Sequence, residues 1–381
     1  MTATDILIYV EDPGAANYVA GLLEAVDRRG CVAELYAAGS GATHLRSLGT
    51  PFEQVSTDDA VATLLDRVPP RVVAVGTSED VDTPAFDLIA EARRRGLVSV
   101  GLVDGPSNAD HRFRGRSQEP LAHAPDWILV ADAAVREQFV TLGASPDRIL
   151  TVGHPRYDTV LALGHRLLTI DRPSLRNRYF PDASPDRPVL VFLTELSDGV
   201  NPDRYHRAPD YTLQGRGDVD GRTEIVLEEV LDAVRDLAPR PYVVLRLHPK
   251  NTAADFAPWL GEIDLLHHGG PADSLLESLY AADLVVGLTT ILMMEAALLG
   301  RPTLSVVPRP SEASWLPSIG LGLTPCVTER EVLRARLPDM LADGWAPRSA
   351  VADVVETGAA ERVAGVLCDL ARPTAAIGQA G

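Results

Sequence analysis

Lysine is almost absent from this 381-residue chain. Lysine and arginine together number 35, and Lys250 is the only lysine among them. Aspartate and glutamate number 53, which gives a formal net charge of −18. A chain this acidic lacks the many phosphate-neutralising side chains that nonspecific nucleic-acid binding requires, so we expect no nucleic-acid partner. A local basic pocket for a small phosphorylated ligand remains compatible with this charge.

Cysteines and long apolar runs are also scarce. The three cysteines, Cys31, Cys326 and Cys368, are far apart in sequence and show neither metal-ligand nor disulfide-framework spacing, which is typical of a reducing compartment. No apolar run reaches the roughly 20 residues that a membrane-spanning helix needs. The first residues enter a strand without a basic segment followed by an apolar signal core. We therefore expect a cytoplasmic protein with no membrane partner.

The length and the alternation of strand and helix patterns predict two α/β domains. A chain of 381 residues is too long for one ordinary hydrophobic core. Short apolar runs alternate with amphipathic stretches almost throughout, which indicates parallel α/β layering. We expect an N-terminal domain over residues 1–165 and a C-terminal domain over residues 186–350. A C-terminal helix within residues 351–372 is expected to pack back toward the N-terminal domain.

A polar turn follows one apolar run of the second half, residues 242–247. Its sequence is His248-Pro249-Lys250, and the proline turns His248 outward at the carboxyl end of the expected strand. An imidazole there can donate a hydrogen bond to a phosphate oxygen. Lys250 adds a compact ammonium, which the fork of an arginine does not reproduce. The alternative is that His248 only satisfies a local turn.

A second polar strand end follows further along the chain, and the carboxyl ends of parallel strands meet at one edge of a sheet. Thr289 and Thr290 open a helix there, where hydroxyls and backbone N–H groups form a ready anion site, although threonine is also a common helix cap. Glu295, on the same helix, could accept the hydroxyls of a ribose. Thr194 and Glu195, after the first strand of the second half, could line the same crevice.

In the first half, Asp104 is the candidate general base, because a carboxylate at a strand end can deprotonate an acceptor nucleophile. Asp12 competes with it. We expect Asp12 to cap the next helix, however, which would engage its oxygens and lower its pKa. His111 is a third candidate. The residues expected to contact an acceptor are Pro13, Gly14, Gly105 and Arg112.

Two glycine-containing segments carry weaker signals. The stretch Gly39 to His44 follows a strand but lacks the third glycine of a dinucleotide-binding fingerprint, so it is poor support for NAD. The charged segment of residues 198–222 is long for a structureless loop inside a compact domain, and such loops are usually functional or disordered. We expect it to help close the cleft or to hold the acceptor.

These motifs resemble those of glycosyltransferases of the GT-B fold, in which two Rossmann-like α/β domains face each other across a cleft. In that family the nucleotide-activated donor binds mainly to the C-terminal domain. Val103-Asp104-Gly105 resembles the acidic-acidic-Gly motif of the branch that contains bacterial sialyl- and polysialyltransferases and CDP-glycerol polymerases. Here Val103 stands at the first acidic position, so the match is partial.

Three further segments carry the resemblance. Residues 247–249 are similar to the His-Pro motif of that branch, and residues 289–290 to its Ser/Thr motif, both of which contact the donor phosphate. Residues 153–158 are similar to the Gly-x-Pro-Arg-x-Asp segment of CDP-glycerol transferases and UDP-GlcNAc 2-epimerases. The matched motifs are short, although the layout covers the whole chain.

The resemblance implies a glycosyltransferase that moves a sugar from a nucleotide-sugar donor to a small soluble acceptor, a hydroxyl or a thiol, with inversion and without a metal. Specialised-metabolite biosynthesis is the expected setting. The co-substrate would be a UDP, GDP or CMP/CDP sugar, with no tightly bound cofactor, and a homodimer is compatible with this assignment. Three alternatives stay open: a non-hydrolysing UDP-GlcNAc 2-epimerase, a CDP-glycerol-type phosphotransferase, and a non-catalytic nucleotide-binding protein.

Overall fold

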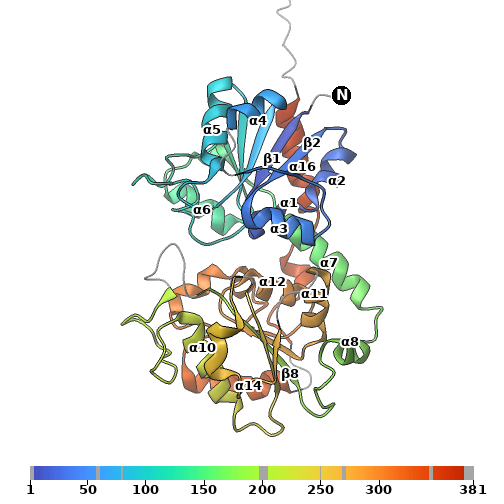
Figure 1. Ribbon diagram of the computed structural model, residues 1–381, viewed down its shortest axis with the longest axis vertical. Helices are drawn as coiled ribbons and strands as arrows, with labels where there is room; N and C mark the ends of the chain where they lie inside the picture. Colours follow the sequence, from blue (N-terminus) through green and yellow to red (C-terminus); the bar gives the residue numbers. More distant parts are fainter. Residues whose placement is uncertain are drawn as a thin grey trace, which may run out of the picture. The chain divides into compact units, whose positions relative to one another are not determined.

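The computed structural model divides into two α/β units (Figure 1). It describes residues 4–56, 61–78, 80–196, 205–248, 250–267, 272–342 and 346–372. The first unit comprises Met1–Thr159 and Glu356–Gly381, and the second comprises Val160–Val355. The chain therefore leaves the first unit once and returns to it for its last helix.

The first unit is built on a parallel sheet with the strand order β3-β2-β1-β4-β5-β6-β7. Its strands are β1 (Ile6–Val10), β2 (Ala33–Ala37), β3 (Glu53–Gln54), β4 (Val72–Gly76), β5 (Val98–Leu102), β6 (Trp127–Val130) and β7 (Ile149–Thr151). Every residue of β1 and β4 is buried, as expected for parallel strands that helices cover on both faces. The order reverses between β1 and β4, so the topological switch point lies there.

Helices flank this sheet, and the last of them comes from the C-terminal part of the chain (Figure 1). They are α1 (Pro13–Val19), α2 (Leu22–Arg28), α3 (Gly39–Ser47), α4 (Val61–Arg67), α5 (Pro84–Arg95), α6 (Ala133–Thr141) and α16 (Ala359–Ala371), with the 3-10 turn η1 (Pro146–Arg148). Val363 and Leu367 of α16 are buried in the same core as β1 and α2. Cys31 and Cys368 meet in this core, and burial, followed by contact with Cys31, raises the pKa of the Cys368 thiol to about 12.

The second unit repeats the pattern with the strand order β10-β9-β8-β11-β12-β13. Its strands are β8 (Val189–Leu193), β9 (Tyr242–Arg246), β10 (Leu265–His267), β11 (Leu284–Gly287), β12 (Thr303–Val306) and β13 (Cys326–Val327). All pairings in this sheet are parallel. Its switch point lies between β8 and β11, which brings the ends of these two strands to one crevice edge.

The helices of the second unit surround this sheet. They are α8 (Arg172–Tyr179), α10 (Arg222–Val234), α11 (Ala272–Ala281), α12 (Ile291–Leu298), α13 (Pro317–Gly320), α14 (Arg330–Leu341) and α15 (Val351–Val354), with the 3-10 turns η2 (Ala253–Trp259) and η3 (Pro310–Trp315). Helix α7 (Pro155–Leu167) crosses the boundary between the units. The prediction of two parallel α/β units is confirmed.

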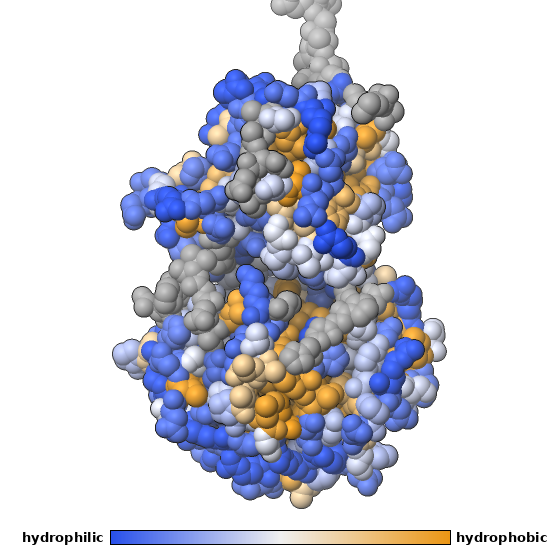
Figure 2. Space-filling model, in the orientation of Figure 1, coloured by the Kyte–Doolittle hydropathy of each residue, from blue (hydrophilic) through white to orange (hydrophobic). Residues whose placement is uncertain are grey.

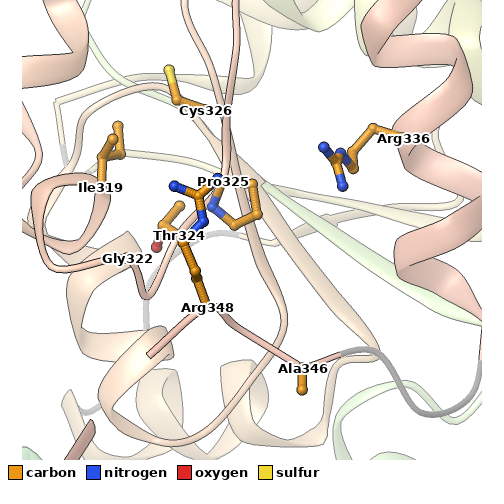
Figure 3. A pocket seen from close by; sticks show the side chains of 8 residues that line it. All are labelled: Ile319, Gly322, Thr324, Pro325, Cys326, Arg336, Ala346 and Arg348. Carbon is orange, nitrogen blue, oxygen red and sulfur yellow. The ribbon is translucent and has the colours of Figure 1, made fainter. Parts of the chain in front are cut away.

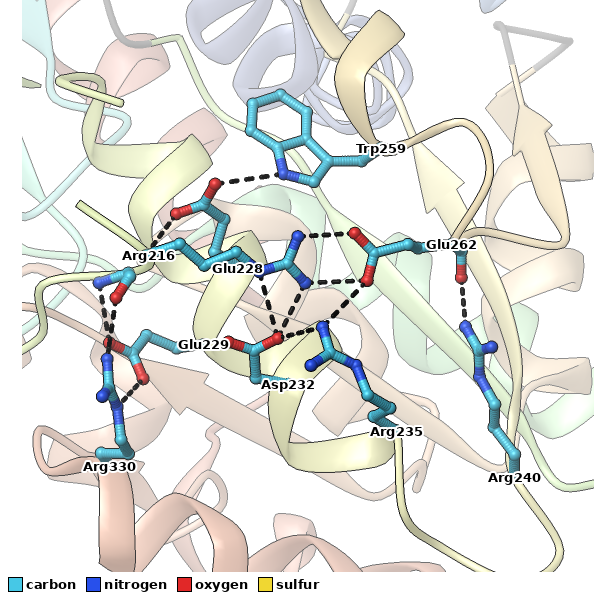
Figure 4. A network of polar contacts seen from close by, with 10 residues as sticks. Arg216, Glu228, Glu229, Asp232, Arg235, Arg240, Trp259, Glu262 and Arg330 are labelled. Atoms are coloured by element: carbon cyan, nitrogen blue, oxygen red, sulfur yellow. Dashed lines mark hydrogen bonds and ion pairs between the residues drawn. The ribbon is translucent and has the colours of Figure 1, made fainter. Parts of the chain in front are cut away.

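The charged segment before α10 is fixed by two carboxylates of that helix (Figure 4). Glu229 Oε1 accepts hydrogen bonds from the backbone N–H groups of Gln214 (3.1 Å) and Gly215 (2.8 Å). Glu228 Oε2 accepts one from the backbone N–H of Arg216 (2.6 Å). Residues 214–216 are therefore tied to α10. Arg222 is the first residue of that helix rather than part of a loop. Residues 198–204 lie outside the described part of the chain.

Polar side chains cover most of the face that Figure 2 shows. Among the described residues, the large apolar side chains that are exposed are Leu168, Ile170, Leu260 and Val332. Each helix within the described ranges is too short or too polar to cross a lipid bilayer.

Candidate functional site

Asp104 lies at the carboxyl edge of the first sheet, just beyond β5. Its Oδ1 accepts hydrogen bonds from Thr77 Oγ1 (3.0 Å) and from Arg112 Nη1 (3.2 Å). Arg112 is 7% exposed, so the carboxylate faces a buried guanidinium. Gly105 makes room for this pair, because a Cβ at that position would lie 2.9 Å from Arg112 Nη2. The structure thus brings together Asp104, Gly105 and Arg112, three of the residues singled out in the sequence.

Gly14 packs against the second carboxylate oxygen of Asp104, Oδ2. A Cβ at Gly14 would be 1.9 Å from Asp104 Oδ2, so the carboxylate rests against the first turn of α1. His154, beyond β7, supports the same residue, since its Nε2 is 3.0 Å from the backbone oxygen of Asp104. The His154 ring stacks on Tyr157. His154 therefore positions the Asp104 backbone.

Asp12 occupies the N-cap position of α1, with Pro13 in the first turn, but its side chain makes no capping hydrogen bond. The expectation that the Asp12 carboxylate caps the helix is therefore wrong. The backbone oxygen of Asp12 accepts the hydrogen bond from Ala16 N–H instead (2.9 Å). The negative charge of Asp12 contributes to raising the pKa of its neighbour Glu11.

Glu11 follows β1 at the switch point and was missed in the sequence. Tyr9 donates a hydrogen bond to Glu11 Oε2 (3.1 Å). Burial raises the pKa of Glu11, hydrogen bonds from Thr83, Ser78 and Tyr9 lower it, and the charge of Asp12 raises it, with a net increase. Its place directly after a buried strand was the signal that could have identified it.

His111 lies in the turn that carries Arg112, but its own neighbour is different. His111 Nδ1 is 3.0 Å from a carboxylate oxygen of Asp110, and the His111 side chain is 19% exposed. Arg112 is the residue of this turn that contacts Asp104. The turn therefore presents a guanidinium, rather than an imidazole, to the candidate base.

In the second unit, hydrogen bonds on both sides of the turn after β9 orient His248. The His248 backbone N–H donates to Thr194 Oγ1 (2.8 Å), and Thr194 Oγ1 donates to Asn251 Oδ1 (2.8 Å). The Lys250 backbone N–H donates to His248 Nδ1 (3.2 Å), so the neutral imidazole carries its proton on Nε2. Burial, and then the charge of Lys250, lowers the pKa of His248. Pro249 lies outside the described residues.

This geometry leaves Nε2–H of His248 as the hydrogen-bond donor for a ligand. The Thr194 hydroxyl, in contrast, accepts from the His248 N–H and donates its single proton to Asn251, so it has no proton left to donate to a ligand phosphate. Asn251 completes the arrangement and was missed in the sequence, because no local pattern links it to Thr194.

The start of α12 already holds an anion from within the chain. The backbone N–H groups of Thr289 and Thr290 both donate to Glu195 Oε1. Thr289 Oγ1 donates to Glu195 Oε2 (3.1 Å), and Arg222 Nη1 donates to the same oxygen (2.8 Å). The sequence indicated a ligand phosphate at this helix start, and the structure places the Glu195 carboxylate there.

Arg222 anchors this arrangement from the interior. Its side chain is fully buried, and it also pairs with Glu312, which is fully buried too (2.6 Å). The Arg222 guanidinium lies over the Trp315 ring, 5.4 Å from its centroid. Burial alone would lower the pKa of Arg222, but Glu195 and Glu312 together raise it. Neither Arg222 nor Glu312 carries a signal in the sequence.

The remaining sequence candidates of α12 are built into the helix. Thr290 Oγ1 accepts a hydrogen bond from Leu292 N–H (3.4 Å) and so caps α12. Glu295 is 1% exposed.

No group of three or more histidine, cysteine or acidic side chains within the described ranges is arranged to hold a metal ion.

A cavity of about 400 Å³ lies elsewhere in the second unit (Figure 3). Its lining includes Thr324, Cys326, Arg336 and Arg348. Thr324 precedes β13, so the cavity lies at the amino end of that strand. In a parallel sheet this is the edge opposite to the one that carries His248, and the cavity is therefore separate from the candidate site.

Comparison with known proteins identifies the fold. No family model and no curated protein matches the sequence. Among solved structures, the UDP-GlcNAc 2-epimerase from Methanocaldococcus jannaschii matches with a TM-score of 0.67 and 13% identity, over 96% of this chain and 100% of that chain. The enzyme from Neisseria meningitidis, solved with UDP-GlcNAc bound, matches with a TM-score of 0.65 and 12% identity, over the same shares.

A third similar structure is a UDP-N-acetylglucosamine 2-epimerase, described as putative, from Listeria monocytogenes. It has a TM-score of 0.63 and 14% identity, over 96% of this chain and 91% of that chain. Identities this low establish the fold rather than the activity. The chain adopts the GT-B type of fold, as the sequence motifs indicated.

Proposed function

We propose that this protein binds a uridine diphosphate sugar and inverts the configuration at C2 of the sugar, as its structural neighbours are named for doing. The structural likeness extends over nearly the whole chain, and neighbouring structures contain UDP-GlcNAc and UDP. It supports the epimerase alternative better than transfer of the sugar to an acceptor.

The observation that carries this proposal is the orientation of His248. Its Nδ1 accepts the Lys250 N–H, so Nε2–H is held as a donor at the carboxyl edge of the sheet. Burial and the charge of Lys250 lower the pKa of His248, which favours the neutral imidazole near pH 7. The neutral ring can still donate a hydrogen bond through Nε2–H. A phosphate oxygen is the acceptor that suits such a donor beside an ammonium.

Inversion at C2 requires one group to remove the C2 proton while the C1–O bond to UDP breaks, which leaves a C1=C2 double bond and free UDP. Another group must then return a proton to the opposite face of C2 while UDP adds back to C1. We assign removal to Asp104, whose carboxylate is held by Thr77 and the buried Arg112. We assign return to Glu11, whose raised pKa favours the protonated form. Carboxyl groups in environments that differ in this way are a common acid and base arrangement.

The test is to incubate the protein with UDP-GlcNAc in D2O and to follow C2 of the sugar by NMR. An epimerase gives the C2 epimer and incorporates deuterium at C2, whereas a transferase leaves C2–H intact. Asp104→Asn should abolish the exchange and keep UDP binding. Absence of both the epimer and deuterium exchange in the wild type would overturn the proposal.

A thermal-shift panel of UDP, GDP, CDP, ADP, TDP and CMP tests the nucleotide independently. UDP at about 100 times its dissociation constant should stabilise the fold by roughly 2.7 kcal/mol. Stabilisation by another nucleotide in place of UDP would contradict the uridine assignment.

Glycosyl transfer is the second candidate. The pair Asp104-Gly105 supports it, because a carboxylate beside a glycine can equally deprotonate an acceptor hydroxyl. In the D2O experiment this activity would appear as acceptor-dependent release of UDP without exchange at C2.

A further inference from the structure

Arg246, the last residue of β9, is a buried cation without a counter-ion among the described residues. Its side chain is 8% exposed. Nη1 donates to two backbone oxygens, those of Leu247 (3.2 Å) and His267 (3.5 Å), and Nε is buried with no hydrogen-bond partner. Burial lowers the pKa of Arg246. A buried charge without a partner is unfavourable, which makes its presence informative.

Other buried arginines of the second unit have carboxylate partners. Arg222 pairs with Glu195 and Glu312, and Arg309 pairs with Asp210 (2.9 Å). Acidic residues also outnumber basic ones in the chain, 53 to 35, so carboxylates are not scarce. The missing partner of Arg246 is therefore a local property of this strand end.

Arg246 is next to the candidate site. Residues 246 and 248 are two apart, so both side chains leave the strand end on the same face of the sheet. After burial and Lys250, the Glu195 carboxylate raises the pKa of His248 and the charge of Arg246 lowers it, so both charges act on the imidazole. The end of β9 thus combines a guanidinium, an ammonium and the Nε2–H of a neutral imidazole.

The other anion position of this unit, the start of α12, is filled by Glu195. The crevice edge therefore offers one set of donors that bind the internal Glu195 carboxylate and another, at the end of β9, that no carboxylate of the described residues pairs with. We propose that the diphosphate of the ligand binds at the end of β9, to Arg246, His248 and Lys250, while Glu195 stays at α12. Arg246 is then a further ligand-binding residue. The identity of the ligand as a uridine diphosphate sugar rests on the proposed function. The anion site itself rests on the positions of Arg246, His248 and Lys250.

The test uses calorimetric titration of the full chain with three probes: UDP, inorganic pyrophosphate and uridine. Arg246→Met removes the charge and keeps an apolar stem. We expect affinity for UDP and pyrophosphate to fall about 10-fold or more, with uridine unchanged. Arg246→Lys should restore most of the loss. We also expect the melting temperature of the ligand-free protein to rise in Arg246→Met, because an unpaired buried charge is gone, whereas a purely structural arginine would give a fall.

The matched control is Arg301→Met. Arg301 is another arginine of this unit whose pKa burial lowers, and it lies before β12, at the opposite sheet edge. Affinity for all probes should be unchanged in this variant. Glu195→Gln tests the start of α12 as the alternative anion site. If the affinity for pyrophosphate rose about 10-fold or more in this variant, the anion would bind at α12 and the proposal would be overturned.

The remaining outcomes separate the two proposals. If Arg246→Met binds UDP and pyrophosphate as the wild type does, the role of Arg246 is wrong and the proposed function stands. If the wild type binds pyrophosphate but not UDP, and Arg246→Met no longer binds pyrophosphate, the anion site is supported and the uridine assignment is wrong. Binding of neither probe by the wild type overturns both. Arg246→Gln provides the same readout if Arg246→Met fails to fold.

Discussion

At the scale of single residues, Gly14 and Asp104 depend on each other. The carboxylate is held by Thr77 and Arg112, so it cannot move aside for a side chain at position 14. Gly14→Ala would place a methyl 1.9 Å from Asp104 Oδ2. We expect a loss of about 1–3 kcal/mol in unfolding free energy and loss of the C2 exchange activity, measured by urea denaturation and by NMR in D2O.

Gly21→Ala is the control for this substitution. The nearest atom to a Cβ at Gly21 is 3.6 Å away, an ordinary contact. Its stability should change by less than about 1 kcal/mol. Equal stability and equal activity of Gly14→Ala and the wild type would show that Asp104 is free to shift.

Glu11 gives a prediction for pH. Its folded pKa is raised, while the unfolded value is about 4.3, so the folded state binds more protons between the two values. Its contribution to stability is complete below about pH 4.3 and is lost as pH rises through the folded pKa. Glu11→Gln removes this dependence, so its stability relative to the wild type should increase from pH 4 to pH 8. A constant difference in urea denaturation across this range would contradict the raised pKa.

Single residues also mark the limit of what the sequence predicts. His248 could be identified because a proline turn after an apolar run has a local signature. The partners of Arg222, in contrast, are Glu195 and Glu312, which are distant in sequence and meet only through the fold. No periodicity or motif could have indicated that Glu195 would occupy the start of α12.

At the scale of elements, α10 and α14 are joined by a charge network (Figure 4). Arg330 donates to both carboxylate oxygens of Glu229, at 2.8 and 2.7 Å, and the Glu229 side chain is 1% exposed. Arg330→Met leaves that carboxylate with backbone donors but no cation. We expect a loss of about 1–3 kcal/mol in unfolding free energy, measured by urea denaturation.

Arg334→Met, on the same helix, is the matched control. Arg334 pairs with Glu331 at the surface, where solvent screens the charges. Its loss should cost less than about 0.5 kcal/mol. If the two variants were equally stable, the buried position of Glu229 would have no energetic consequence.

The central strands could be predicted and the edge strands could not. The apolar run at residues 242–247 becomes β9 (Tyr242–Arg246), and the first run becomes β1 (Ile6–Val10). Strands β3 and β13 have two residues each, too few to show any period. The segment before α10 shows no period in its sequence, because its order comes from Glu228 and Glu229, which lie on the next helix.

At the scale of the whole molecule, the two units have separate cores, so damage to one should stay local. Leu367 of α16 is fully buried in the core of the first unit. Leu367→Ala should destabilise that unit by about 2–5 kcal/mol. Hydrogen exchange should then accelerate in β1 and β4 and stay slow in β9 and β11. Equal acceleration in all four strands would show that the units unfold together.

The sequence predicted the architecture better than the activity. Alternating strand and helix patterns predict α/β units with parallel sheets, because few other arrangements bury short apolar strands between helices. The choice between epimerisation and transfer depends, under the proposed assignment, on how a sugar binds at Asp104 and Glu11, and one fold supports both chemistries. Short motifs such as His248-Pro249 point to a contact with a donor phosphate, which an epimerase and a transferase both need, so they could not separate the two activities.

The division of the first unit into two stretches of sequence has a consequence during synthesis on the ribosome. Helix α16 completes the first unit, but Val160–Val355 must be translated before it. At about 5–20 residues per second, this interval lasts on the order of 10–40 s. For that time the apolar surface that α16 will cover stays open in the nascent chain. The second unit can finish folding first. Meanwhile the incomplete first unit exposes an apolar surface of the kind that chaperones bind.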